Sequence, residues 1–181
     1  YIATDIKEIV NCPRLNIVKR PKEICTDSSP LDDTLRYVVR KFEESGENYD
    51  YIVMCHVNIP IRKEGEIDKL IKIAIDNPDA TSVCTAYEVE RPYEWTFEQK
   101  GKYFYRPITN DKFRKQDLPS RFMIDGAIQL HKVETLMKAT GKAFEYFGDK
   151  IIIVPHDKKF GEEIDTQADY DYVEYLLKKG E

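Results

Sequence analysis

The sequence predicts a three-layer α/β domain with a mostly parallel sheet and helices on both faces. Apolar runs of strand length alternate along the chain with segments whose apolar residues recur at helical spacing, which is typical of such domains. The 181 residues contain neither internal repeats nor low-complexity linkers, as expected of one domain. We therefore predict a single domain over residues 1–181, with an insertion at about residues 91–121.

The N-terminal part of the chain predicts two short strands followed by a helix. The strands are expected at residues 1–4 and 15–18. Ser29 is expected to be the N-cap of the helix, with Pro30 at its first position and Asp32 placed to answer the cap. The helix should end near Gly46, and its apolar stripe consists of Leu31, Leu35, Val38, Val39 and Phe42.

The remainder of the chain predicts four strands, a hairpin and two helices. The hairpin is expected at residues 97–105, turning at Lys100-Gly101. One helix follows Gly65, and the last helix starts at Thr166, with Asp169 completing a capping box. The strands are expected at residues 51–55, 82–89, 122–130 and 151–154. The first of these four is apolar enough to be a central strand covered on both faces.

Composition and charge argue against several classes of protein. The 28 basic residues are outnumbered by 33 acidic ones, whereas nucleic-acid-binding domains usually carry a basic excess, so we expect no nucleic-acid partner. No apolar run approaches the ~20 residues that span a bilayer, and no membrane partner is expected. The four cysteines form no CxxC pair and the three histidines are scattered. This argues against a zinc site and indicates reduced thiols in the cytoplasm.

Polar residues that follow the predicted strands are the first candidates for a binding site. In open α/β sheets, ligands bind beyond the carboxyl ends of the strands. Three arginines are placed to converge there, namely Arg20, Arg62 and either Arg114 or Arg121. Guanidinium groups bind phosphate and carboxylate in bidentate fashion, so the pattern predicts an anion pocket. The alternative is that these are ordinary surface arginines.

Glu163-Ile164-Asp165 is a candidate metal site. In an extended segment residues i and i+2 point to the same side, so both carboxylates can face one cation while Ile164 points inward. Two carboxylates together with substrate phosphates suit Mg²⁺. The alternative is that Asp165 and Thr166 merely cap the last helix.

For two further segments the sequence is compatible with either a functional or a structural role. Residues 114–119 form a polar loop ahead of the strand that contains Asp125, and a solvated connection is the plain alternative. Tyr103, Phe104 and Tyr105 lie together in the predicted hairpin rather than along core strands. Aromatic residues in such a hairpin are more often packing or dimer contacts than platforms for a base.

Seven segments, taken in order, resemble the acylneuraminate cytidylyltransferases, the CMP-sialic acid synthetase family. They are spread in register over nearly the whole chain, which makes the set far more specific than any one motif. The segments are Ala3-Thr4-Asp5, residues 19–30 with Arg20-Pro21 and Ser29-Pro30, Pro60-Ile61-Arg62, Arg91-Pro92-Tyr93, residues 114–119 (RKQDLP), Asp125-Gly126-Ala127-Ile128 and Glu163-Ile164-Asp165-Thr166.

The resemblance implies a nucleotide-diphospho-sugar-transferase fold of the GT-A, Rossmann-like type, and a homodimer. As a separate prediction, we expect the hairpin around residues 95–105 to lie at the dimer interface. The resemblance further implies transfer of CMP from CTP to a nonulosonate sugar, with release of pyrophosphate, for the synthesis of surface polysaccharide. It also implies the following roles: Glu163 and Asp165 for Mg²⁺, Asp165, Arg62 and Arg114 for catalysis, Asp5, Arg20 and Ser29 for the nucleotide, and His56, Asn58, Gln116 and Asp125 for the sugar.

The chain also departs from the family's pattern. The opening strand and Gly-rich, Lys-bearing loop of the family are absent, so we expect residues upstream of Tyr1 to belong to the functional chain. His56-Val57-Asn58-Ile59 replaces Gln-Pro-Thr-Ser, which predicts a different sugar or altered activity. Leu31 stands where family members often have a hydroxyl, and Asp125 replaces Asn.

A non-catalytic nucleotide-sugar-binding or dimerisation module of the same fold is the alternative. A glycosyltransferase of related fold would need an acidic pair at the end of a central strand, which residues 56–58 do not offer.

Overall fold

The structure is a computed structural model and describes all residues except 11–12, 14–15, 27, 110, 113 and 181. Within the described part of the chain no helix is long and apolar enough to cross a bilayer. The residues group into two compact units. The first unit consists of Tyr1–Met54, Ile67–Val83 and Gln129–Ile152, and the second of Cys55–Glu66, Cys84–Ile128 and Ile153–Glu181. The single domain with an insertion at about residues 91–121 stays a prediction.

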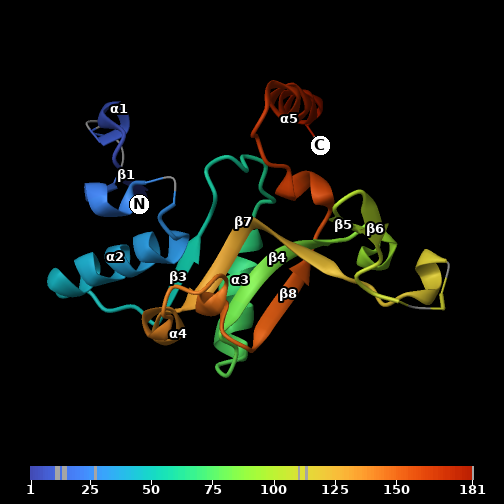
Figure 1. Cartoon of the computed structure of the whole chain (residues 1–181). Helices are drawn as coiled ribbons and strands as arrows, with labels where there is room; N and C mark the ends of the chain where they lie inside the picture. The colour runs from blue at the N-terminus through green and yellow to red at the C-terminus, as the bar shows by residue number, and fades with distance from the viewer. Residues whose placement is uncertain (11–12, 14–15, 27, 110, 113, 181) are drawn as a thin grey trace. The chain divides into compact units, whose positions relative to one another are not determined.

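A four-stranded sheet contains the longest strands (Figure 1). Its order is β3 (Tyr51–Met54), β7 (Phe122–Lys132), β4 (Ser82–Glu88) and β8 (Ile151–Pro155). β3 pairs antiparallel with β7, with Tyr51 opposite Lys132 and Met54 opposite Gln129. β3 therefore ends this order and is only half-buried over its first three residues. The prediction of a central strand at residues 51–55 is wrong. A short apolar run occurs both in central strands and in strands at the end of a sheet, so the sequence does not distinguish the two positions.

The sheet is mixed rather than mostly parallel, which corrects the sequence prediction. Lys132 N donates to Thr81 O and Val89 N to Arg121 O, so β7 runs opposite to β4. A parallel return would need a crossover, usually an α-helix. The described residues between β4 and β7 form only two 3₁₀ turns, η2 (Tyr93–Trp95) and η3 (Lys115–Asp117), and a hairpin. The chain therefore comes back alongside the strand that it left.

The hairpin consists of β5 (Glu98–Lys100) and β6 (Tyr103–Tyr105), paired antiparallel with Glu98 opposite Tyr105. It turns at Gly101, whose φ of 63° suits glycine. All side chains of both strands are exposed. A hairpin therefore lies where the aromatic segment predicts one, and its role in a dimer stays a prediction.

In the first unit, helix α2 (Leu31–Glu44) buries Leu35, Val38 and Val39 of its predicted apolar stripe. The two ends of the stripe differ from the prediction, because Leu31 is exposed and Phe42 is half-buried. The helix start differs from the prediction. Pro30 is the N-cap and makes no side-chain cap, whereas the Ser29 hydroxyl accepts from Thr26 N at 3.1 Å. Ser29 thus closes the preceding turn, a common alternative use of a serine hydroxyl.

The first unit also contains the short strands of the N-terminal segment. β1 (Ile2–Thr4) pairs in parallel with β2 (Ile17–Lys19). Residue 15, where the second strand is predicted to begin, lies outside the described residues. The remaining helices of the described chain are α1 (Lys7–Val10), α3 (Glu66–Asp76), α4 (Val133–Lys138), η1 (Lys22–Ile24), η4 (Glu145–Phe147) and η5 (Lys158–Gly161).

In the second unit, helix α5 (Gln167–Lys179) begins as predicted. Thr166 is its N-cap, and Thr166 and Asp169 form a reciprocal capping box. Val173 and Leu176 face inward and form a buried cluster with Ile61, against which Phe160 and Ile164 pack. This cluster fixes the segment before α5 beside the loop that carries Ile61, and both segments contribute to the candidate site.

Candidate functional site

The predicted site residues fall into both units. The second unit contains His56, Asn58, Arg62, Arg114, Gln116, Asp125, Glu163 and Asp165, and the first contains Asp5, Arg20 and Ser29.

Glu163 and Asp165 lie on one side of their segment, as the alternation of an extended chain predicts. The Asn58 amide Nδ2 donates to Glu163 Oε1 and to Asp165 Oδ1, both at 3.2 Å. Ile164 points the other way, into the buried cluster, and its backbone N donates to Asn58 O at 2.8 Å. The two carboxylates therefore converge on one polar atom.

The helix cap next to this pair does not use the Asp165 carboxylate. Thr166 Oγ1 accepts from Asp169 N, and Asp169 Oδ2 accepts from Thr166 N at 2.8 Å. Capping thus falls to Thr166 and Asp169 rather than to Asp165. Among the described residues no group of three or more His, Cys, Asp or Glu side chains could hold a metal ion. Glu163 and Asp165 therefore suit Mg²⁺ only if phosphate oxygens and water molecules supply the remaining ligands of the ion.

The loop after β3 is attached to the Asp125-Gly126-Ala127 turn. Arg62 Nε donates to Ala127 O at 3.2 Å, and Arg62 Nη2 donates to His56 O at 2.5 Å. His56 N donates to Gly126 O at 3.2 Å. A Cβ at Gly126 would lie 2.8 Å from His56 Nδ1, and the φ of this residue is +80°, so only glycine lets the ring lie there.

Two groups of this loop retain hydrogen-bonding capacity. A guanidinium has five N–H donors, and the two bonds of Arg62 described above use only part of them. His56 Nε2 is buried and makes no hydrogen bond to any described residue. Because buried polar atoms are rarely left without a partner, this nitrogen indicates a place for a ligand or a water.

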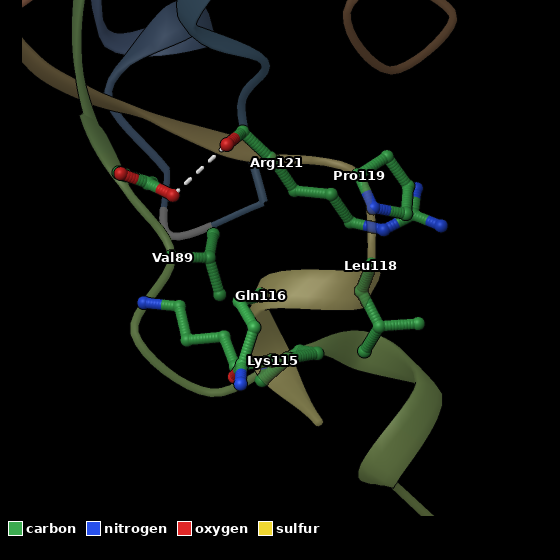
Figure 2. A pocket seen from close by; sticks show the side chains of 9 residues that line it. Val89, Lys115, Gln116, Leu118, Pro119 and Arg121 are labelled. Carbon is green, nitrogen blue, oxygen red and sulfur yellow. Dashed lines mark hydrogen bonds between the residues drawn. The ribbon is translucent and has the colours of Figure 1, made fainter. Parts of the chain in front are cut away.

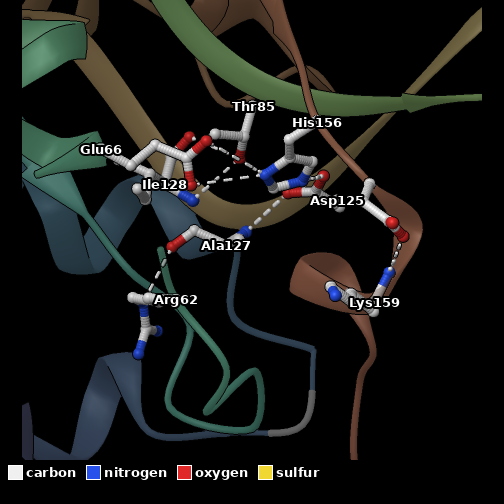
Figure 3. Close-up of polar contacts among 9 residues, drawn as sticks. Arg62, Glu66, Thr85, Asp125, Ala127, Ile128, His156 and Lys159 are labelled. Atoms are coloured by element: carbon white, nitrogen blue, oxygen red, sulfur yellow. Dashed lines mark hydrogen bonds and ion pairs between the residues drawn. The ribbon is translucent and has the colours of Figure 1, made fainter. Parts of the chain in front are cut away.

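The Asp125 side chain is buried, and Figure 3 shows the polar groups that surround it. Its Oδ2 lies 2.6 Å from His156 Nε2, and its Oδ1 accepts from Thr85 Oγ1 at 2.8 Å and from Ala127 N at 2.9 Å. Burial works to raise the pKa of Asp125, but the hydrogen bonds from His156, Ala127 and Thr85 outweigh it and lower the pKa. Asp125 is thus an ionised residue that shapes its own turn.

His156, Glu66 and Thr85 are the members of this network that sequence reasoning missed. His156 follows the last strand directly, which is the position where site residues are expected. That was the only local signal. Its pairing with Asp125 and Glu66 spans 31 and 90 residues along the chain, and no spacing rule reports such contacts.

A cavity of about 290 Å³ lies in the second unit beside the RKQDLP segment (Figure 2). It is lined by Glu88, Val89, Pro92, Lys115, Gln116, Leu118, Pro119, Ser120 and Arg121. Arg121 Nη2 binds the buried Glu94 at 2.5 Å, and this bond lowers the pKa of Glu94. The Arg121 guanidinium is thus already paired with Glu94. The other basic and amide side chains at the cavity are Lys115 and Gln116, which are the better candidates to bind a ligand.

Arg114 is adjacent in sequence to this cavity but is not among its lining residues. Its Nε donates to Asp117 Oδ2 at 2.9 Å, and its side chain is largely exposed. A surface ion pair of this kind is weak and is easily exchanged for another anion. The predicted anion-binding role of Arg114 therefore requires it to leave Asp117.

In the first unit, Asp5 and Arg20 are in contact. Arg20 Nη2 donates to Asp5 Oδ1 at 2.7 Å, and Arg20 N donates to Thr4 O at 3.0 Å. The bond from Arg20 lowers the pKa of Asp5. Arg20 Nε is buried and makes no hydrogen bond to any described residue. Ser29 is engaged with Thr26, so these three predicted nucleotide residues form one contacting pair and one separate turn.

Comparison with known proteins reveals the fold. No family model and no curated protein matches the sequence. Among solved structures, the chain is similar to CMP:2-keto-3-deoxy-manno-octonic acid synthetase complexed with CTP, with a TM-score of 0.65 and 15% identity. The match covers 99% of this chain and 80% of that synthetase. The chain therefore shares the fold of that synthetase.

Proposed function

We propose that the protein is a Mg²⁺-dependent cytidylyltransferase that transfers CMP from CTP to a sugar acid of the nonulosonate type and releases pyrophosphate. One observation carries the proposal: Glu163 and Asp165 converge on Asn58 at 3.2 Å each, in the segment to which the motif resemblance assigns the metal. The similarity in fold to a synthetase of a CMP-linked sugar acid supports the same reaction class. We also propose a cytoplasmic location and a homodimer.

In the proposed reaction the anomeric oxygen of the sugar attacks the α-phosphorus of CTP. A new P–O bond forms, the bond to the pyrophosphate oxygen breaks, and the hydroxyl proton passes to solvent. When bound, Mg²⁺ would neutralise phosphate charge and favour ionisation of the attacking hydroxyl. Glu163 and Asp165 would hold the ion, and Asn58 would keep the two carboxylates together.

The anionic groups of both substrates require basic partners. Arg62 is held by two backbone carbonyls and keeps further N–H donors for the sugar carboxylate. Gln116, with Lys115, lines a cavity large enough for part of a sugar. Asp5, Arg20 and Ser29 are proposed for the nucleotide. Asp125 acts on the sugar indirectly, through the turn that it shapes. Positioning and charge stabilisation supply most of the rate in such chemistry.

The test is pyrophosphate release from CTP by the full-length protein, including any residues that precede Tyr1. A panel of eight- and nine-carbon 2-keto sugar acids is offered, with and without Mg²⁺. We expect turnover of at least one sugar only with the metal. Asp165→Ala should lower kcat by roughly 100-fold or more, as loss of a charge-stabilising group does.

The matched control is Asp171→Ala, which removes a carboxylate of α5 that binds Gln167. This variant should keep normal turnover. If no sugar is turned over but CTP binds tightly, the result would instead favour the non-catalytic nucleotide-sugar-binding module. Full activity of Asp165→Ala would contradict the metal assignment.

A further inference from the structure

Three ionisable side chains form a buried cluster in the second unit, and two of them, His156 and Glu66, are not among the residues predicted for the site. His156 Nε2 lies 2.6 Å from Asp125 Oδ2, and His156 Nδ1 lies 3.4 Å from the Glu66 carboxylate (Figure 3). Their side chains are 4%, 0% and 5% exposed, in the order His156, Asp125 and Glu66. Burying charges is costly unless they are paired and hydrogen-bonded, so such a cluster needs a reason.

The cluster determines the shape of the Asp125-Gly126-Ala127 turn. One Asp125 oxygen faces His156, and the other accepts from Thr85 Oγ1 and from Ala127 N. The backbone of Gly161 closes the remaining side, because a Cβ at this residue would lie 2.7 Å from Asp125 Cβ. Both oxygens of the Asp125 carboxylate are therefore held, one of them by His156.

The Asp125-Gly126-Ala127 turn also holds the loop that carries His56 and Arg62. Gly126 O accepts from His56 N and Ala127 O accepts from Arg62 Nε, each at 3.2 Å. The His56 ring fills the space above Gly126. A continuous path of contacts thus leads from His156 through Asp125 and the turn to Arg62.

We propose that His156, as an imidazolium held between Asp125 and Glu66, is the positioning residue that fixes Arg62 and His56 for binding of the sugar. This inference rests on the proposed function for the identity of the ligand. The geometry favours the cation, because only the protonated ring donates from both nitrogens and so satisfies a carboxylate on each side. A neutral ring would leave one buried carboxylate facing a lone pair.

The electrostatics agree with this protonation state. Burial alone would lower the pKa of His156, but the hydrogen bond that the ring donates to Asp125 and the charges of Asp125 and Glu66 outweigh it and raise the pKa. Among the described residues, the ring contacts Asp125 from β7, Glu66 from α3 and the uncharged Phe160 of η5, whose ring centroid lies 5.8 Å from that of His156. The stabilisation is therefore complete below the unfolded value of about 6.5 and is lost as pH rises through the higher folded pKa.

The first test is an NMR titration of the three histidines in the full-length protein. We expect His156 to titrate above 6.5 and Asp125→Asn to lower its pKa. Asp157→Asn is the matched control, because it removes a neighbouring carboxylate that binds Lys159 N instead. Amide exchange at His56 and Ala127 should accelerate in Asp125→Asn and not in the control. Titration of wild-type His156 at or below 6.5 would overturn the proposal.

The second test follows KM and kcat for the sugar against pH. The wild-type KM should rise as His156 loses its proton. In His156→Gln the KM should be raised roughly 10- to 100-fold, because a small misplacement of a binding group weakens binding by that order. The KM of this variant should no longer change over the pH range in which His156 titrates. The double variant His156→Gln/Asp125→Asn should recover part of the loss by restoring a neutral pair. A KM profile unchanged in His156→Gln would overturn the proposal. If the wild type turns over no sugar, the proposed function fails, and unchanged amide exchange in Asp125→Asn is then the result that overturns the positioning role.

Discussion

His131 is a buried histidine whose environment favours the neutral ring. It is 0% exposed, and Tyr146 and Phe147 pack edge-on against it at 5.0 and 4.9 Å between ring centroids. Ser82 Oγ donates to Phe147 O, so the 2.9 Å contact between Ser82 Oγ and His131 Nδ1 requires the ring to donate there. Burial lowers the pKa of His131 to about 4. His131 and His156 thus have opposite preferences, the one neutral and the other charged.

The first prediction concerns acid stability. The unfolded chain takes up a proton on His131 near pH 6.5 and the folded chain only near 4, so the free energy of unfolding should fall as pH drops through this window. At ~1.4 kcal/mol per pH unit the loss amounts to about 3 kcal/mol. Urea denaturation at pH 7 and at pH 4 measures it. In His131→Gln this part of the pH dependence should disappear, and an equally steep loss in the variant would assign the effect to other groups.

At the scale of single elements, helix α5 depends on its first turn. The capping box of Thr166 and Asp169 satisfies backbone N–H groups that no helical carbonyl reaches. The same helix packs Val173 and Leu176 against Ile61, so loss of the cap loosens the segment that carries Glu163 and Asp165.

We predict that Thr166→Ala lowers the free energy of unfolding by about 1 kcal/mol, the usual cost of removing a Thr cap. Thr166→Ser retains the hydroxyl and should recover most of it. Chemical denaturation of the three proteins under one condition gives both numbers. Equal stability of the Ala and Ser variants would show that the hydroxyl contributes nothing.

The elements that could be predicted from the sequence are those determined by neighbouring residues. The α5 cap, the strand at 82–88 and the alternation of Glu163, Ile164 and Asp165 all follow from local patterns. The direction of β7 could not be predicted, because it depends on how the chain returns from residues 89–121. The prediction of Ser29 as the helix cap was wrong for a related reason. The Ser29 hydroxyl accepts a hydrogen bond from Thr26 N in the preceding turn instead of capping the helix.

The candidate site divides in the same way. Polar residues after strands were visible in the sequence, and Asn58, Glu163 and Asp165 do meet in the second unit. The partner of Asp125 was not visible, because a lone histidine 31 residues away gives no periodic signal. The order of the motifs predicts a reaction class, whereas the contacts between the side chains are known only from the structure.

At the scale of the whole molecule, the aromatic hairpin is the surface that most needs a partner. Tyr103, Phe104 and Tyr105 are 58%, 62% and 50% exposed, and Phe97 in front of them is 55% exposed. Alternation along β6 places Phe104 on one face of the ribbon and Tyr103 and Tyr105 on the other. Exposed aromatic side chains are typical of interfaces, where Tyr, Trp and Phe are enriched. An antiparallel two-stranded ribbon is also marginal by itself and gains stability by packing against another surface.

We therefore predict a homodimer at micromolar concentration, joined through the hairpin, and a shift to monomer in Phe104→Lys. The substituted ammonium would have to be buried without a partner at the centre of the contact, which weakens association by several kcal/mol. Sedimentation velocity of the full-length protein measures the mass. Tyr170→Lys is the matched control, because Tyr170 is 50% exposed on α5 and not part of the hairpin. A wild-type monomer at these concentrations would contradict the prediction, and a dimer that persists in Phe104→Lys but dissociates in Tyr170→Lys would move the interface to α5.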